Sequence, residues 1–169
     1  EINLTDAEID KIKSMNATAV IPMHIMSGDW SQAQINGLKY QFEIMGVEVL
    51  AVTDAGFKAE KQVSDIETLL AKNPDILISI PTDPTATAPA YRKAAEQGVI
   101  LVFMDNVPNG FVAGKDYISA VSADNMGNGV ASAHLMAKAL NQQGEIGIIF
   151  HAADFFVTAQ RYEGFKKTI

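Results

Sequence analysis

The chain has 169 residues, contains no cysteine and carries a formal net charge of −7 at pH 7. This acidity argues against nucleic acid and against an anionic membrane surface as partners, because both attract basic patches. The absence of cysteine excludes disulfides, thiol nucleophiles and cysteine metal sites, and it permits an oxidising compartment. With 48% hydrophobic residues, the chain can form a real core, and its length suits one domain, or one domain and part of a second.

Apolar runs and helical spacings alternate along the chain. Thr5 and Glu8 form a capping box, which predicts a first helix ending near residue 15. Apolar, β-branched runs predict strands at 18–23, 47–53, 76–80, 99–104 and 117–121. Helices are predicted between the first four strands, over 35–45 with Gly46 as C-terminal glycine, over 63–70, and over 84–97. This alternation predicts an α/β fold, a doubly wound, Rossmann-like parallel sheet with right-handed crossovers.

The character of the sequence changes at Ser122. Asp124 and Asn125 form a helix N-cap region, and small residues keep the next helix thin, which predicts close packing on another backbone: Gly127, Gly129, Ala131 and Ala133. A strand is predicted over 145–150 and a further helix from Thr158. One strand and two helices cannot complete a covered sheet. We therefore expect an N-terminal helix over 1–16, one lobe over 17–121, and over 122–169 the beginning of a second lobe whose remainder is absent.

Polar and aromatic residues follow four of the apolar runs, at 23–30, 80–83, 104–108 and 150–156. Because parallel strands end at one edge of a sheet, these residues should line a single crevice. In the first junction, Asp29 precedes Trp30, whose flat face can stack on the C–H face of a sugar; the alternative is a Trp packed under the loop. His24 can donate to and accept from hydroxyls, or it can be a structural hydrogen-bonding residue.

The later junctions add charged and amide groups. Asp105 and Asn106 can bind hydroxyls strongly, although the same pair also favours a turn. Asp83 fits an N-cap for a helix beginning at Pro84, with direct contact as the alternative. Near the last helix, Arg161 can bind two hydroxyls at once, beside a loop with further candidates, Asp154, Phe155 and Phe156.

Templates for catalysis are missing from the sequence. The first strand–helix loop lacks the glycine pattern of dinucleotide-binding folds, and neither a Walker motif nor a nucleophile elbow occurs. The three histidines lack metal-type spacing. We therefore predict no catalytic residues, no metal and no cofactor. Because Asp residues outnumber the single Arg at the strand ends, the expected ligand is neutral rather than a phosphate or carboxylate.

Five short segments, in order, resemble the ribose-binding type of periplasmic sugar-binding proteins of ABC importers. They are 29–37, 80–83, 104–106, 122–125 and 161–165, and the resemblance extends over roughly residues 17 to 169. It implies a type I periplasmic binding fold, with Trp30 stacking on the sugar and Asp105 and Arg161 binding it. Two positions depart from the family pattern: Asn106 stands where the family has Arg, and Ser31 stands in place of a second aromatic residue.

The resemblance implies a receptor that captures a neutral sugar or polyol between two lobes and delivers it to a membrane permease. It also implies a periplasmic location, or an extracellular lipoprotein in a Gram-positive cell, after removal of a signal peptide. Because the chain begins with Glu1, we expect a processed or trimmed start. The rest of the polypeptide, or a second chain, should complete lobe two. The alternative function is the effector-binding domain of a LacI-type transcription regulator. An enzyme is disfavoured by the missing templates.

Overall fold

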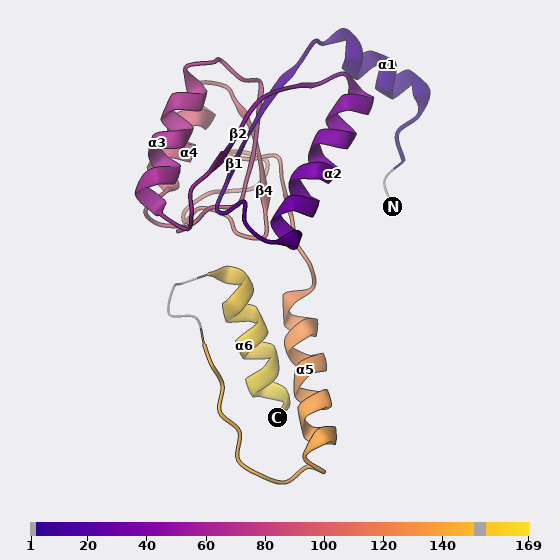
Figure 1. The fold of residues 1–169 in the computed structure, drawn as a ribbon, viewed down its shortest axis with the longest axis vertical. Helices are drawn as coiled ribbons and strands as arrows, with labels where there is room; N and C mark the ends of the chain where they lie inside the picture. The colour runs from indigo at the N-terminus through magenta and orange to yellow at the C-terminus, as the bar shows by residue number, and fades with distance from the viewer. Residues whose placement is uncertain (1–2, 151–154) are drawn as a thin grey trace.

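The computed structural model describes residues 3–150 and 155–169. Within these residues, five strands form one sheet in the order β2-β1-β3-β4-β5, and each strand runs parallel to its neighbours (Figure 1). The strands are β1 (Thr18–Met23), β2 (Glu48–Asp54), β3 (Ile76–Ser79), β4 (Ile100–Met104) and β5 (Ser119–Val121). The predicted doubly wound parallel sheet is confirmed, and its strands differ from prediction only at their ends.

Helices cover both faces of this sheet (Figure 1). The helix α2 (Asp29–Met45) packs on one face, while α3 (Ala59–Leu70) and α4 (Ala88–Glu96) pack on the other. Successive residues of a strand point to opposite faces, so Val20 joins the core under α3 and α4, and its neighbour Ile21 joins the core under α2. No helix in the described residues is long and apolar enough to cross a bilayer.

Two of the predicted helix ends are present in the structure, the start of the first helix and the end of the second. The helix α1 (Asp6–Ser14) packs against α2, outside the sheet, and begins with the expected capping box: the Thr5 N–H donates to a Glu8 carboxylate oxygen at 2.8 Å. At the end of α2, Gly46 has a φ of +67°, a left-handed value that glycine adopts at little cost. Local sequence therefore sets these two boundaries.

The helix α4 begins four residues later than predicted, at Ala88 instead of Pro84. The Asp83 carboxylate accepts hydrogen bonds from the backbone N–H groups of Thr85 and Ala86, each at 2.8 Å. These local bonds stabilise a turn before the helix, because a short acidic side chain competes with helical hydrogen bonding. Asp83 thus organises the turn and is not the N-cap residue of α4.

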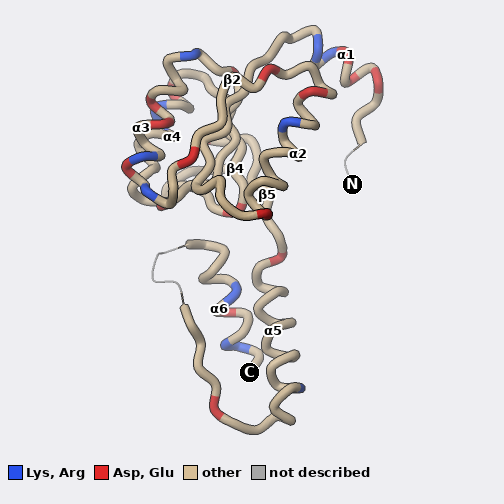
Figure 2. The backbone as a smooth tube through the Cα atoms, in the orientation of Figure 1, with Lys and Arg blue, Asp and Glu red and all other residues tan. Residues whose placement is uncertain are grey.

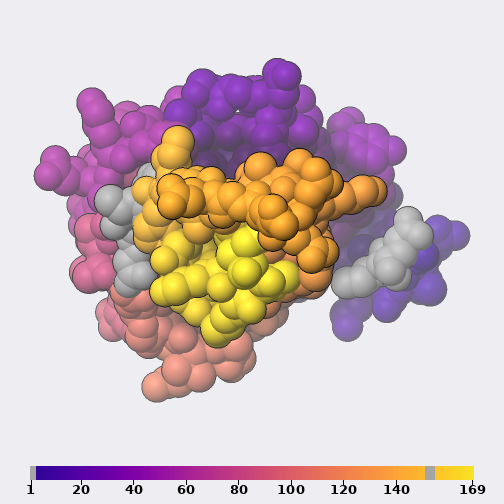
Figure 3. Space-filling model, turned by 90° about the horizontal axis from the view of Figure 1, so that it is seen from below, coloured from indigo at the N-terminus to yellow at the C-terminus, as the bar shows by residue number. Residues whose placement is uncertain are grey.

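Beyond β5, the chain forms a pair of helices, α5 (Asn125–Ala139) and α6 (Phe156–Thr168). They pack side by side below the edge at which the strands end, as Figures 1 and 3 show. A Cβ on Gly129 would meet the carbonyl oxygen of Arg161, and one on Gly164 would meet that of Met126. The close packing predicted from the small residues of α5 is therefore confirmed, with the backbone of α6 as the partner.

The prediction of a strand over 145–150 is wrong. These residues form no ladder in the structure, and most of them are exposed. Their contact is through side chains: the rings of Phe150 and Tyr162 lie 4.8 Å apart between centroids. A β-rich composition produces a strand only where a neighbouring backbone supplies donors and acceptors, and the described residues place no such neighbour beside this segment.

Candidate functional site

The order of the strands places a crevice at the carboxyl end of the sheet. The connection from β1 leads to β2 on one side, whereas β3, β4 and β5 extend the sheet on the other side. The loops after β1 and β3 therefore diverge, and open α/β sheets bind ligands at this kind of switch point.

A cavity of about 750 Å³ lies at this edge, between the strand ends and the beginning of α6. Its size falls within the usual range for small-molecule sites, and its lining is mostly apolar with a few polar groups. The lining residues come from three regions: the ends of the strands with their loops, α2, and the first turns of α6. Six of them were predicted as ligand-binding residues: His24, Trp30, Asp105, Asn106, Phe155 and Arg161.

Three aromatic rings form one wall of the cavity. The ring of His24 lies edge-on to Trp30, with centroids 6.1 Å apart, and edge-on to Phe57, with centroids 5.1 Å apart. Trp30 is 52% exposed and Phe57 57% exposed, so both present ring surface to the cavity. Sequence reasoning missed Phe57. The rule applied to the other strand ends would have found it, since it follows the end of β2 by three residues.

Two side-chain polar atoms, in residues that line the cavity, have no hydrogen-bond partner among the described residues. They are Nδ1 of His24 and Oδ1 of Asn106, both inaccessible to bulk solvent. Burial lowers the pKa of His24 below its ordinary value of 6.5, while the carboxylates of Asp105 and Asp54 act in the opposite direction. A neutral imidazole and an amide oxygen are suited to hydroxyl groups, because buried polar atoms are normally hydrogen-bonded.

The Asp105–Asn106 pair is both a turn and part of the cavity wall. Asp105 has a φ of +57°, and its backbone N–H donates to the carbonyl of Val121 at 2.8 Å. Acidic and amide residues tolerate this left-handed conformation better than most. The turn directs Asp105 to the cavity at the point where β4 and β5 end. The two alternatives left open by the sequence are therefore compatible.

A chain of hydrogen bonds connects Asp105 to Arg161. The Arg161 Nε–H donates to Oδ1 of Asn125 at 2.8 Å, and Nδ2 of Asn125 donates to the Ser122 hydroxyl at 2.9 Å. That hydroxyl in turn donates to Oδ1 of Asp105 at 3.0 Å. These hydrogen bonds connect the end of the sheet to α6, and they hold a carboxylate and a guanidinium at the same cavity. Figure 2 marks the acidic and basic residues along the backbone.

Gln62 of α3 supports the floor beneath the cavity. Its side chain is fully buried, and its Oε1 accepts from the N–H and the hydroxyl of Thr82, each at 2.7 Å. Its amide donates to the carbonyls of Ile80 at 2.9 Å and Pro22 at 3.2 Å. These bonds fix the chain after β3 relative to the end of β1. Gln62 had not been predicted, because only the fold brings it under these strand ends.

The other predicted residues that the structure describes lie off the cavity. Trp30, Gln34 and Leu38 share the face of α2 that lines the cavity, as spacings of four residues require. Asp29 and Ser31 therefore point elsewhere, the former exposed and the latter buried. Asp83 holds the turn before α4, and Phe156 is exposed at the start of α6. Asp154 lies outside the described residues.

The charges of the cavity are balanced. Among the described residues that line it, Asp105 is the carboxylate and Arg161 the guanidinium. In the same part of the chain, no group of three or more His, Asp or Glu side chains could hold a metal ion. The site therefore presents aromatic surface, one charge of each sign, and the imidazole and amide side chains of His24 and Asn106, a combination that suits a neutral ligand with several hydroxyls.

Comparison with known proteins identifies relatives of this chain. The sequence model of one family, described as a periplasmic binding protein domain, matches residues 19–169. The chain is 28% identical over 128 residues to the D-ribose/D-allose-binding protein of Pseudomonas aeruginosa, covering 75% of this chain. It is 28% identical over 130 residues to the ribose import binding protein of Bacillus subtilis, covering 76% of this chain.

The fold has close matches among solved structures. The Caulobacter myo-inositol binding protein, bound to myo-inositol, matches with a TM-score of 0.76 at 25% identity over 90% of this chain. The chain spans 39% and 41% of the length of the two curated relatives and 50% of that structure. Since the family match extends from β1 to the end of α6, the chain belongs to the periplasmic binding protein domain family.

Proposed function

We propose that this chain is the ligand-binding part of a solute-binding receptor of an ABC importer, specific for a neutral sugar or polyol. The observation that carries the proposal is the cavity itself. It combines the Trp30 ring, Asp105 and Arg161 connected by hydrogen bonds, and the side chains of His24 and Asn106. Each of these features can bind a hydroxylated ring or an acyclic polyol, and none requires a charged ligand.

The relatives support the ligand class. The names of the two curated relatives specify ribose and allose, and that of the solved structure specifies myo-inositol. All are neutral and polyhydroxylated. The sequence also allowed the effector-binding domain of a LacI-type regulator, but none of the relatives described above is a regulator. We therefore propose the receptor function and not the regulator function.

The proposal includes a division into lobes. Residues 17–121 form lobe one behind the N-terminal helix of residues 1–16, and residues 122–169 form the beginning of lobe two. The support is that β5 ends at Val121 and that α5 and α6 pack mainly on each other, below the sheet. Closure of the two lobes on the ligand would create the form that the membrane permease accepts, in the periplasm or at the outer cell surface.

Calorimetry on the protein expressed from its complete reading frame tests the function. The titrants are D-ribose, D-allose, myo-inositol and ribitol, each neutral, and D-ribose 5-phosphate as the charged counterpart. We expect at least one neutral compound to bind and the phosphate to bind much more weakly, because Asp105 opposes a second anion. Binding of the phosphate with no response to any neutral compound would refute the proposal.

A further inference from the structure

The loop between β2 and α3 is attached to the loop that follows β1. The Phe57 N–H donates to the carbonyl of His24 at 2.8 Å. The Asp54 carboxylate accepts from Met26 at 3.2 Å and from Gly56 at 2.8 Å, so one side chain bonds to both loops. Hydrogen bonds therefore hold the backbone of Phe57 beside His24.

The backbone of Phe57 adopts an unfavourable conformation. Its φ is +59°, a value at which a bulky residue is a genuine outlier and which glycine or asparagine would adopt at lower cost. Burial does not account for the choice of residue, because 57% of Phe57 stays exposed. A strained position that carries an exposed aromatic ring is typical of a binding site.

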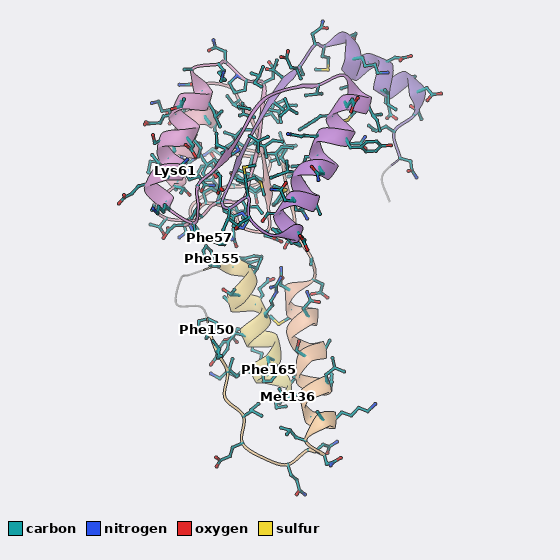
Figure 4. All side chains as sticks on the ribbon, viewed as in Figure 1. Phe57, Lys61, Met136, Phe150, Phe155 and Phe165 are labelled. Carbon is teal, nitrogen blue, oxygen red and sulfur yellow. The ribbon has the colours of Figure 1, made fainter. Side chains whose placement is uncertain are left out.

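The ring has a defined place in the cavity. It lies edge-on to His24 with an interplanar angle of 74°, and Trp30 lies edge-on to the same ring at 78°. Figure 4 shows Phe57 at the end of the sheet that faces α6. Phe57 and Phe155 both line the cavity. Trp30 and Phe57 thus both contact the His24 ring, whose Nδ1 is buried without a partner in the described residues.

We propose that Phe57 is a second ligand-stacking residue, and that Trp30, His24 and Phe57 together select ring-form ligands with an apolar C–H face. A sugar ring or cyclitol presents such a face together with hydroxyls at its rim. The two aromatic rings cover the C–H groups, and His24 binds a hydroxyl between them. An acyclic polyol has no fixed apolar face and therefore gains less binding free energy from the two aromatic rings. This inference rests on the proposed function and names the ligand class of the same site.

Substitutions at Phe57 separate binding from folding. The probes are D-ribose, D-allose, myo-inositol and acyclic ribitol, titrated by calorimetry into the full-length protein. Phe57→Gly should lower the affinity for the tightest-binding ring-form ligand by about tenfold. The affinity for ribitol should fall by a smaller factor. The same variant should raise the melting temperature of the unliganded protein, because glycine relieves the positive φ. Phe57→Tyr keeps a ring and should restore affinity to near the wild-type value.

Tyr40→Ala is the matched control, because Tyr40 is an aromatic residue of α2 that is 66% exposed and does not line the cavity. It should leave every affinity unchanged. Wild-type protein that binds none of the four probes would overturn the proposed function and this assignment with it. Wild-type binding that survives unchanged in Phe57→Gly would overturn the role of Phe57 alone. Preferred binding of ribitol by the wild type would overturn the ring selectivity.

Discussion

Asn125 accepts a hydrogen bond from the guanidinium of Arg161 at 2.8 Å, although one residue opens α5 and the other lies on α6. Only 1% of Asn125 is exposed, so this amide is a buried partner for a charged side chain. Through Ser122, it also connects to Asp105 at the end of β4. Asn125 is the buried member of this network, whereas Ser122 and Arg161 are exposed, so the buried amide anchors the hydrogen bonds of the exposed groups. The two charged groups of the cavity are therefore positioned together.

Asn125→Ala should weaken ligand binding by about tenfold, because Arg161 loses the acceptor that orients it; a hydrogen bond to a charged group contributes roughly 1.5–3 kcal/mol. Calorimetry measures the effect, with the neutral compound that binds the wild-type protein most tightly as the titrant. Asn128→Ala is the control, since Asn128 is an exposed residue on the same helix. Equal affinities for the Asn125 and Asn128 variants would contradict the positioning role.

Asp105→Asn should lower ligand affinity about 10- to 100-fold while leaving the fold intact. The amide keeps the shape of the side chain and tolerates the φ of +57°, but it loses the charge that strengthens hydrogen bonds to hydroxyls. Asp105→Ala is a poorer test, because alanine also strains the turn. Affinity and thermal melting should be measured on the same preparation. A large loss of stability with unchanged affinity would show that Asp105 serves the turn alone.

Acid should destabilise the protein through His24. Its folded-state pKa lies below the ordinary value of 6.5, so the folded protein binds fewer protons than the unfolded chain. The stability contributed by His24 is fully present above pH 6.5 and is lost as the pH falls from there through the lowered folded-state pKa. Urea unfolding of the wild type and of His24→Gln between about pH 5 and pH 8 isolates this contribution.

In that comparison, the wild type should lose stability more steeply than His24→Gln below pH 6.5, because glutamine does not titrate. The other titratable groups are common to both proteins, so the difference between the two curves reports mainly on His24. Two parallel stability curves would be inconsistent with a lowered pKa at His24.

Gly129→Ala should destabilise the packing of α5 on α6 by about 1–3 kcal/mol. The new methyl group would meet the Arg161 carbonyl and the Phe165 N–H, which are backbone atoms and cannot rotate away. Gly37→Ala is the matched control in α2, where a Cβ meets nothing within 4 Å. There alanine should stabilise by roughly 0.5–1 kcal/mol, since it lowers the entropy cost of the helix. Thermal melts that shift in the same direction for both variants would disprove the close contact.

The parallel sheet and the edge that carries the cavity could be predicted from the sequence. The reason is that the signals are local: the capping box at Thr5, the glycine after α2, and apolar runs that end in polar residues. His24, Trp30 and Asp105 were found by the same rule, because the carboxyl ends of parallel strands meet at one edge whatever their order. The small residues of α5 likewise predicted its close packing on another backbone.

Tertiary structure decided which strand-end residues face the cavity. Asp83 and Asp105 both follow buried strands, yet the N–H groups of a local turn occupy the carboxylate of Asp83. Phe57 enters the wall because hydrogen bonds attach its loop to the β1 loop, and Gln62 supports the floor because α3 crosses beneath two strand ends. Residues 145–150 have the composition of a strand and form none. Such outcomes depend on partners distant in the chain, whereas local patterns report only the propensity of each segment.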